Sequence, residues 1–254
     1  MRQVLLTRRA ALAGLGSAAG ALALLSCGDS SSTGTAVSAN SAASAASACV
    51  TSPEGEIGPY FVDDSAAGFN RSDIRSNLDG TNTQNGIPFT LNIVVGDSEN
   101  SCAGMQGVQV DIWHCNAEGV YSDEGVESTT GETWLRGYQL TDTAGYVTFT
   151  TIFPGWYQGR TTHIHLRLRS KYSSASSTSD GTNTTQVFFA QALIDTINTT
   201  VAPYSSHGSN PTSNESDRVY SEQTEGKMEL VLTGDSTAGY SATAIIDLPI
   251  TAAG

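Results

Sequence analysis

Apolar and polar residues alternate in short stretches along this chain, which is the pattern of β-strands with one buried face. Glycine, asparagine, aspartate and serine separate these stretches, whereas the 3.6-residue period of helices is weak throughout. The predicted strands are residues 89–95, 108–113, 146–152, 163–168, 186–194, 228–232 and 242–248. We therefore expect an all-β fold, a β-sandwich core of mostly antiparallel strands with long loops and little helix.

The N-terminal residues 1–27 have the composition of an export signal. Positive charge precedes an uncharged apolar run over residues 10–25, which is shorter than the about 20 residues that a membrane-spanning helix needs. Arg8 and Arg9 resemble a twin-arginine export signal, with ordinary secretion as the alternative. The Leu-Leu-Ser-Cys sequence that ends at Cys27 resembles a bacterial lipobox, so we expect an exported, cell-surface or periplasmic lipoprotein with Cys27 lipidated. The alternative is a plain signal peptide that is cleaved further on.

Residues 28–48 are mostly serine, alanine, threonine and glycine. This composition cannot bury a core, so the segment is predicted to be a flexible tether. Residues 49–254 are sufficient for one domain with a substantial core. Contact with a membrane is expected only through the lipid anchor.

The charge of the chain limits its partners. Without the three arginines before Cys27, nine basic and 25 acidic residues remain, a formal charge of −16, which argues against a nucleic-acid partner. Five of the nine basic residues fall within positions 136–171: Arg136, Arg160, Arg167, Arg169 and Lys171. Such a local basic region suggests an anionic ligand, while Arg169 and Lys171 could equally protect a strand edge from pairing.

Three cysteines remain in the mature chain, so one pair and one leftover thiol are expected in an oxidising compartment. Cys102 and Cys115 flank a single predicted strand, and we predict a disulfide between them if the segment before the strand doubles back. This pairing would leave Cys49 over, and sequence alone does not prove it. There is no Cys-x-x-Cys spacing to indicate a zinc–thiolate site.

Residues 154–165 hold a tyrosine, an arginine and two of the four histidines of the chain. In a strand, His163, His165 and Arg167 share one face and the apolar residues between them share the other. Two imidazoles at this spacing lie ~7 Å apart at Cβ, so both can reach one metal ion. The alternative is a pair of surface histidines on an edge strand.

Further motifs precede this segment in the sequence. Tyr121 follows the strand ending at Trp113, and the sequences Leu-Arg-Gly-Tyr-Gln-Leu-Thr-Asp and Gly-Tyr-Val-Thr-Phe-Thr-Thr-Ile occupy residues 135–142 and 145–152. In order and spacing these blocks resemble the intradiol ring-cleavage dioxygenases, the family of catechol and protocatechuate dioxygenases. The resemblance runs from about Ser52 through Phe189.

The resemblance implies a mononuclear non-haem Fe(III) ion held by Tyr121, Tyr157, His163 and His165 on a β-sandwich. It also implies a small catecholic substrate, cleaved with O2 between its two hydroxylated carbons to give a muconate-type diacid. Phenolates are hard anionic donors that suit trivalent iron, and the ion would lower a tyrosine pKa from its usual ~10. Tyr157 is expected to leave the metal and take up a proton when the catechol binds.

The same resemblance assigns roles around the metal. Arg160 matches an arginine that lies over the substrate, where a permanent positive charge stabilises negative charge that develops in the reaction. Gln186 is a weaker catalytic candidate, and Pro59 and Tyr60 are assigned to substrate binding. His114 matches no ligand of the family, and we interpret it as structural.

Two departures from the family pattern stand out. Only five residues separate Tyr157 from His163, and no helical dimerisation segment precedes Cys49, so the chain is closer to the shorter protocatechuate-type subunit. The choice of catechol and the oligomeric state stay open. The main alternative function is a catalytically inactive, transthyretin-like β-sandwich that binds a ligand at the cell surface. A zinc hydrolase that uses His-x-His with a carboxylate is a second alternative, but it leaves both tyrosines unexplained.

Overall fold

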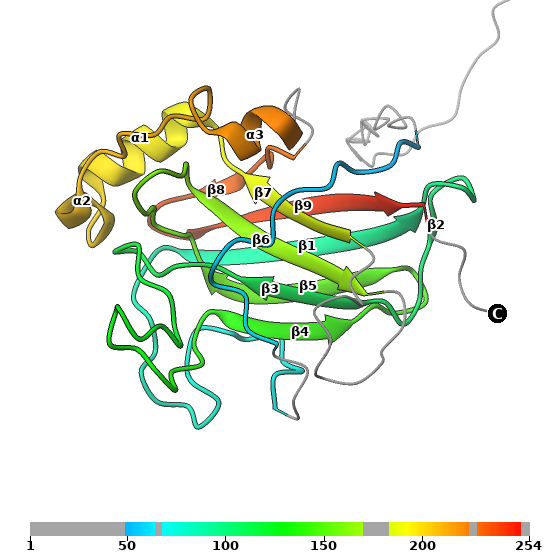
Figure 1. Ribbon diagram of the computed structural model, residues 1–254, viewed down its shortest axis with the longest axis horizontal. Coiled ribbons are helices and arrows are strands. Elements are labelled where there is room, and N and C mark those ends of the chain that lie inside the picture. The colour runs from blue at the N-terminus through cyan, green and yellow to red at the C-terminus, as the bar shows by residue number, and fades with distance from the viewer. Residues whose placement is uncertain (1–48, 64–67, 170–182, 224–227, 250–254) are drawn as a thin grey trace, which may run out of the picture. The chain divides into compact units, whose positions relative to one another are not determined.

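The computed structural model describes residues 49–63, 68–169, 183–223 and 228–249, which belong to one compact unit, Ser47–Gly254. Two sheets face each other and little of the described chain is helical, so the all-β sandwich is confirmed (Figure 1). The predicted export signal and tether, residues 1–48, lie outside the described residues, as does Lys171.

The first sheet is built around β1 (Pro88–Asp97). Its other strands are β2 (Ala103–Gly104), β5 (Tyr146–Ile152), β8 (Thr233–Asp235) and β9 (Gly239–Leu248). β2 and β5 pair with β1 in antiparallel fashion, β9 pairs with it in parallel, and β8 pairs with β9. This sheet forms one wall of the core.

The second sheet has four antiparallel strands in the order β4-β3-β6-β7. Their bounds are Gln109–Trp113 for β3, Arg136–Leu140 for β4, His163–Arg169 for β6 and Asn183–Phe188 for β7. The register places Trp113 opposite His165 and His165 opposite Gln186. The His-x-His pair therefore lies on an interior strand of the sheet, which excludes two surface histidines on an edge strand.

The core lies between the two sheets, where strand alternation places the apolar residues. The inward side chains of β1, β5 and β6 are fully buried or nearly so: Phe89, Leu91, Ile93, Val95, Val147, Phe149, Ile164, Leu166 and Leu168. The opposite, outer face of β6 is buried as well, because His163, His165, Arg167 and Arg169 are each at most 4% exposed. Something other than the first sheet must cover this polar face.

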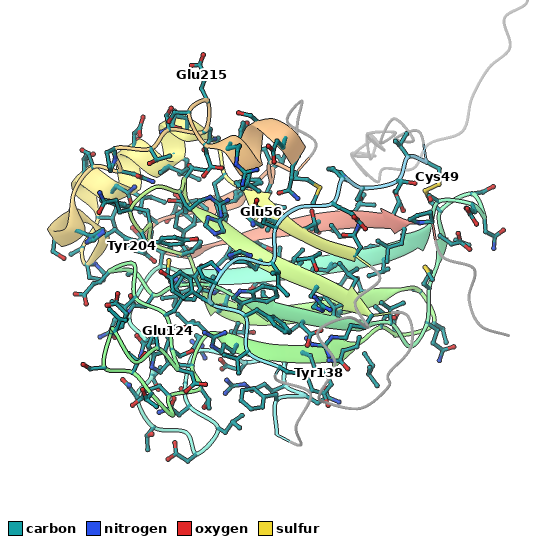
Figure 2. All side chains as sticks on the ribbon, in the orientation of Figure 1. Cys49, Glu56, Glu124, Tyr138, Tyr204 and Glu215 are labelled. Carbon is teal, nitrogen blue, oxygen red and sulfur yellow. A yellow bond between two sulfur atoms is a disulfide. The ribbon has the colours of Figure 1, made fainter. Side chains whose placement is uncertain are left out.

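That cover is residues 52–63, which we call the strap. In Figure 1 the strap is the blue segment that crosses in front of β7 and β6, and Glu56, labelled in Figure 2, belongs to it. Gly55 N–H donates to the Thr184 carbonyl at 2.7 Å, and the Gln186 amide donates to the Glu56 carbonyl at 2.8 Å. The strap therefore closes the polar face like a third layer.

Three helices follow β7, where the sequence pattern indicated little helix: α1 (Gln191–Thr200), α2 (Tyr204–His207) and α3 (Arg218–Gln223). The strand predicted over residues 186–194 is therefore wrong beyond Phe188. Ile194 and Ile197 of α1 are buried in the core, a spacing of three that marks a helical face. Among the described residues, no helix is long and apolar enough to cross a membrane.

Other element predictions need correction. Residues 228–232 do not form a strand; Glu229 makes a single bridge to Phe188, and β8 begins only at Thr233. β4 was not predicted, because Arg-Gly-Tyr-Gln-Leu has no clear apolar alternation. It forms through its pairing with β3.

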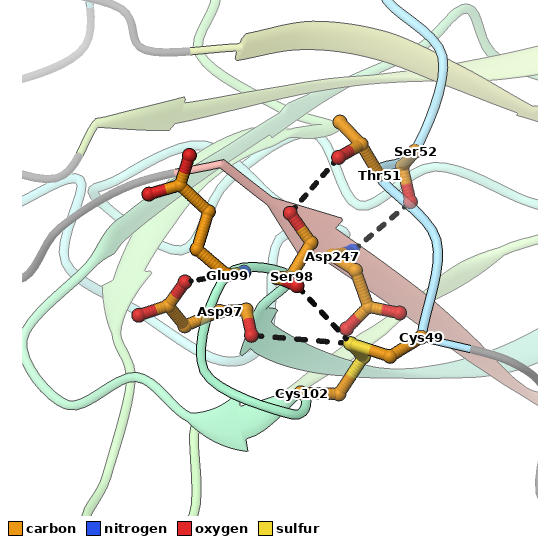
Figure 3. Close-up of a disulfide and its surroundings, with 8 residues drawn as sticks. All are labelled: Cys49, Thr51, Ser52, Asp97, Ser98, Glu99, Cys102 and Asp247. Atoms are coloured by element: carbon orange, nitrogen blue, oxygen red, sulfur yellow. Dashed lines mark hydrogen bonds between the residues drawn. A yellow bond between two sulfur atoms is a disulfide. The ribbon is translucent and has the colours of Figure 1, made fainter.

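The predicted Cys102–Cys115 disulfide is wrong. Cys49 and Cys102 form the disulfide, with 5.6 Å between their Cα atoms (Figure 3). Cys115 is a buried free thiol. β3 rises about 3.3 Å per residue and carries Cys115 to the end of the sheet away from the β1–β2 turn that holds Cys102. The chain before β3 thus does not double back onto Cys115. Instead, the disulfide links Cys49, three positions before the strap, to that turn.

Candidate metal centre

His163 and His165 open β6 and project from its outer face toward each other. Their Nε2 atoms are 3.0 Å apart, and both side chains are buried. His163 Nδ1 lies 2.6 Å from the Thr161 carbonyl oxygen, which can only accept, so Nδ1 holds the proton and the lone pair of His163 is on Nε2. Both Nε2 atoms therefore face one point, as two ligands of one metal ion would.

The two predicted tyrosine ligands reach this point from separate loops. The Tyr157 ring lies 5.5 Å from the His163 ring, the Tyr121 ring 6.5 Å from the His165 ring, and the two tyrosine rings 5.6 Å from each other, all between centroids. All four predicted ligands thus come together.

A glycine in the turn after β3 allows the two loops to approach. Gly119 has φ +85°, and a Cβ there would collide with the Trp156 carbonyl oxygen. Only glycine combines this backbone conformation with such a close contact. The turn therefore lies directly against the residue that precedes Tyr157.

Burial keeps the four groups uncharged. It raises the pKa of Tyr157 to about 12, against the opposing charge of Arg160, and raises that of Tyr121 well above its usual value near 10. It lowers the pKa of His163 to about 3 and, with the neighbouring His163, that of His165 well below 6.5. Neutral imidazoles have free lone pairs for a metal, whereas the phenols would need a nearby cation in order to ionise.

The residues present fit a ferric ion. The Tyr121 hydroxyl oxygen is buried and has no hydrogen-bond partner in the part of the chain that the structure describes, an arrangement that costs free energy unless something binds that oxygen. Two imidazole nitrogens and two hard phenol oxygens are donors that suit Fe(III). Among the described residues, no group of three or more His, Cys, Asp or Glu side chains could hold a metal ion.

Aromatic rings and the strap enclose these donors. The Trp113 indole stacks on the His165 ring with 4.8 Å between centroids and 7° between planes. Tyr60 stacks on Tyr121 at 4.3 Å and meets Tyr157 edge-on at 5.4 Å. Tyr60 thus lies at the site, as its predicted contact with substrate requires.

Two other residues of the strap lie next to Tyr60. Gly58 has φ +71°, and a Cβ there would lie 3.0 Å from His165 Cε1, so glycine lets the strap lie against the imidazole. Pro59 is exposed on the strap, and its role stays a prediction.

The predicted catalytic pair, Arg160 and Gln186, is in direct contact. Arg160 Nη2 donates to Gln186 Oε1 at 2.5 Å, and the Gln186 amide continues to the Glu56 carbonyl of the strap. Gln186 lies opposite His165 in the sheet register, so its contact brings the guanidinium beside the cluster. There the Arg160 charge opposes the rise that burial causes in the pKa of Tyr157 and adds to the fall that burial causes in the pKa of His163. On its other side Arg160 Nε pairs with Asp217 Oδ2 at 2.8 Å.

The other arginines of the 136–171 region are not a ligand surface. Buried Arg136 donates to the Tyr60 carbonyl and to the backbone and hydroxyl of Ser122, so it joins the strap to the residue after Tyr121. Arg169 is paired with the carboxylates of Asp111 and Asp63, and β6 has a neighbour on each side, so Arg169 does not protect a strand edge. The Arg136 guanidinium carbon lies 6.0 Å from the centroid of the Tyr121 ring, so Arg136 also borders the cluster, although its hydrogen bonds go to the strap and to Ser122.

His114 is structural, in agreement with the sequence interpretation. It is buried, its Nε2 lies 2.7 Å from the Thr151 hydroxyl and its Nδ1 lies 2.8 Å from the Cys115 carbonyl. Burial lowers its pKa to about 4 and raises that of the Cys115 thiol to about 12. Both ring nitrogens of His114 are therefore used within the protein.

Four contributors to the site were not predicted: Trp113, Gly58, Thr161 and Asp217. Trp113 lies on the same, polar face of β3 as Asp111, because the two residues are two positions apart. Once β3 and β6 are known to pair, this alternation places Trp113 beside the histidines of β6. Asp217 has no such signal, because it lies 57 residues after Arg160 in a stretch of polar residues.

The chain is similar to known proteins in sequence and in fold. The sequence model of the family described as Dioxygenase matches residues 57–192. An intradiol ring-cleavage dioxygenase from Tetranychus urticae is 26% identical, with a TM-score of 0.64, covering 81% of this chain and 98% of that one. No sequence among the curated proteins matches this chain.

Two bacterial structures are similar in fold. The dioxygenase domain of a dioxygenase carbohydrate-binding protein fusion from Streptomyces sp. SirexAA-E is 24% identical, with a TM-score of 0.52 and coverage of 78% and 99%. Catechol 1,2-dioxygenase from Pseudomonas arvilla C-1 is 20% identical, with a TM-score of 0.53 and coverage of 78% and 62%.

Proposed function

The chain belongs to the intradiol ring-cleavage dioxygenase family, and from this premise we propose that it is an active, non-haem Fe(III) member. The proposed reaction cleaves a catecholic ring between its two hydroxylated carbons. Both atoms of O2 enter the product, a muconate-type diacid.

One observation supports this proposal above the others: the buried, unpartnered Tyr121 hydroxyl belongs to the same cluster as the facing imidazoles. A ligand-binding sandwich without a metal would gain nothing from this arrangement, because an unpartnered buried hydroxyl destabilises the fold. Tyr121, Tyr157, His163 and His165 are the proposed ligands. Bound Fe(III) would act as a Lewis acid that draws electron density from the coordinated catecholate and so makes the ring reactive toward O2.

The chain itself supplies proton handling and charge. Tyr157 Oη is the proposed acceptor of one catechol proton, because burial favours the neutral form of this phenol. Arg160 holds a permanent positive charge beside Tyr157 and His163, where it stabilises negative charge that develops on substrate oxygens. Gln186 holds the guanidinium from one side, and Tyr60 and Trp113 line the site with aromatic surface.

The visible spectrum and iron content of the purified protein test the metal centre. Tyrosinate bound to Fe(III) absorbs in the visible by charge transfer, so Tyr121→Phe and Tyr157→Phe should each change the band. Tyr146→Phe is the matched control, because this exposed tyrosine of β5 bonds only to Asn92 among the contacts found for its hydroxyl. A colourless, iron-loaded protein would contradict the ligand assignment, and a protein that takes up no iron would favour the inactive binding sandwich.

Labelled O2 and mass spectrometry test the reaction. A panel of catechols should include one that gives a ring-opened diacid with two labelled oxygen atoms. An aldehyde from cleavage beside the diol, or no turnover by the iron-loaded protein across the panel, would refute the proposed activity.

We also propose, from the sequence alone, that the enzyme is exported and held at a membrane by lipid on Cys27. Replacement by Cys27→Ala should move the protein from the membrane fraction to the soluble fraction after cell fractionation. A wild-type protein that is already wholly soluble after processing rules the anchor out.

A further inference from the structure

The segment between α2 and α3 holds the loop that carries Tyr157 and Arg160. Its contacts fall within the six loop residues 156–161. The Trp156 indole donates to the Gly208 carbonyl at 2.9 Å, and the Asn210 amide donates to the Arg160 carbonyl at 2.9 Å. The Thr161 and Asn214 side chains share a hydrogen bond of 2.6 Å. This segment lies beyond residues 57–192, the part of the chain that matches the family.

Asp217 makes the innermost of these contacts. Its side chain is fully buried, and three N–H groups donate to its carboxylate. Oδ2 accepts from Arg160 Nε and from Thr161 N, each at 2.8 Å, and Oδ1 accepts from Tyr220 N at 2.9 Å. No single neutral side chain of this size offers acceptors to all three donors.

The carboxylate fixes the guanidinium plane of Arg160. Asp217 holds Nε on one side, and Gln186 holds Nη2 on the other. A planar guanidinium that is bonded at two of its three nitrogens cannot rotate away from the cluster. Its charge therefore points at Tyr157 and His163 before substrate arrives.

The same carboxylate reaches the predicted metal ligand His163 through one residue, Thr161. Asp217 accepts from the N–H of Thr161, whose carbonyl accepts the Nδ1 proton of His163 at 2.6 Å. That second bond sets the tautomer and the direction of Nε2. One buried side chain thus orients both the proposed charge stabiliser and a proposed metal ligand.

We infer that Asp217 is a positioning residue for the proposed ring cleavage, acting through Arg160 and the Thr161–His163 contact. The inference rests on the proposed function and deepens it, because it places part of the reaction geometry outside the family-matched part of the chain. A purely structural ion pair would instead stabilise the fold without coupling to Arg160 in turnover.

A double-mutant cycle on the iron-loaded enzyme separates the two roles. Arg160→Ala should lower kcat by about 100-fold, and Asp217→Asn by about 10-fold, with KM for the catechol changed by less than about 3-fold. The double variant should match Arg160→Ala alone to within about 3-fold, because residues that act as a unit are not additive. Glu222→Gln in α3 removes an exposed carboxylate of the neighbouring ion pair and should leave kcat unchanged.

A second readout does not depend on iron or activity. In a ¹⁵N-resolved NMR spectrum of the metal-free protein, the Arg160 Nε–H signal should be protected from exchange in the wild type and in Glu222→Gln. It should lose that protection in Asp217→Ala, which removes both acceptor oxygens. Arg160→Lys assigns the signal by removing it.

Additive losses in kcat, or full activity of Asp217→Asn, would overturn the inference while leaving the proposed function intact. Persistence of the protected Nε–H signal in Asp217→Ala would also overturn it. An iron-loaded wild type that cleaves no catechol overturns the proposed function and, with it, this role of Asp217.

Discussion

The two ends of the polar face under the strap differ in how their charges are balanced. At one end lie His163, His165, Tyr121 and Tyr157, which we call the metal end. At the other end lie Asp63, Asp111, Arg167 and Arg169, which we call the ionic end. There Arg169 pairs with Asp111 at 3.0 Å and with Asp63 at 3.2 Å, and the Arg169 and Asp111 side chains are each 3% exposed.

The difference shows what each end needs in order to stay buried. At the ionic end, the chain supplies both signs of charge, and the Phe61 ring lies 5.2 Å from the Arg167 guanidinium carbon and 5.7 Å from that of Arg169. At the metal end, the groups are neutral, and donor atoms face one another or no partner. A buried charge must be paired within the protein, whereas a cluster of unused donors is stabilised by a cation from outside.

The largest expected effect comes from removing a donor at the metal end. His165→Gln should weaken iron binding by more than about 100-fold, since loss of a residue that merely orients a ligand can already cost that much. Iron per chain after dialysis against a chelator measures it. His114→Gln is the control: this satisfied histidine should keep the iron but lose about 1–3 kcal/mol of stability, because its two hydrogen bonds are internal. Full iron retention in His165→Gln would remove the distinction between the two ends.

The next effect is at the ionic end. Arg169→Leu leaves the buried Asp111 carboxylate and the half-buried Asp63 carboxylate without their shared partner and should lower the free energy of unfolding by about 3–5 kcal/mol, measured in urea at pH 7. Arg75→Leu breaks an ion pair whose side chains are 39% and 51% exposed, and should cost no more than about 1 kcal/mol. Equal losses in the two variants would show that burial does not set the strength of these pairs.

A smaller effect is expected from the disulfide that anchors the chain before the strap. Cys49→Ser should lower the free energy of unfolding by about 2–4 kcal/mol, because the bond closes a loop with a sequence separation of 53. Non-reducing peptide mapping should first show the Cys49–Cys102 link in the wild type. The matched control is Cys115→Ala, which leaves the disulfide in place; free thiols at positions 49 and 102 in the wild type would refute the pairing.

The smallest effect is a pH dependence at the ionic end. Burial raises the pKa of Asp111 to about 6, against the opposing charge of Arg169, while the unfolded chain titrates near 4. The folded state therefore holds this proton more tightly than the unfolded chain does. As the pH rises from 4 to 6, the free energy of unfolding should fall by about 1 kcal/mol per pH unit, and it should level off above pH 6. Asp111→Asn should flatten this part of the stability profile, which urea titrations at several pH values would show. An unchanged slope would mean that another group titrates there.

Local alternation was sufficient for β1, β3, β5, β6 and β9, but not for β4, for the end of β7 or for residues 228–232. Alternation with period two placed His163 and His165 on one face of β6 and the apolar residues on the other, because successive side chains of a strand must point to opposite sides. The boundaries of β5 were predicted without error for the same reason. Clustering within twelve residues drew attention to Tyr157 and Arg160 before any tertiary structure was known.

Only the tertiary structure decided the rest. The Cys49–Cys102 pairing, the strap over the polar face and the hold of Asp217 on Arg160 all join residues more than 50 positions apart. Whether Arg160 and Arg169 face the cluster or a carboxylate likewise depends on which segments lie beside β6. Periodicity reports the two sides of a strand and nothing about its neighbours, because strand order and the path of covering segments arise from packing distant parts of the chain.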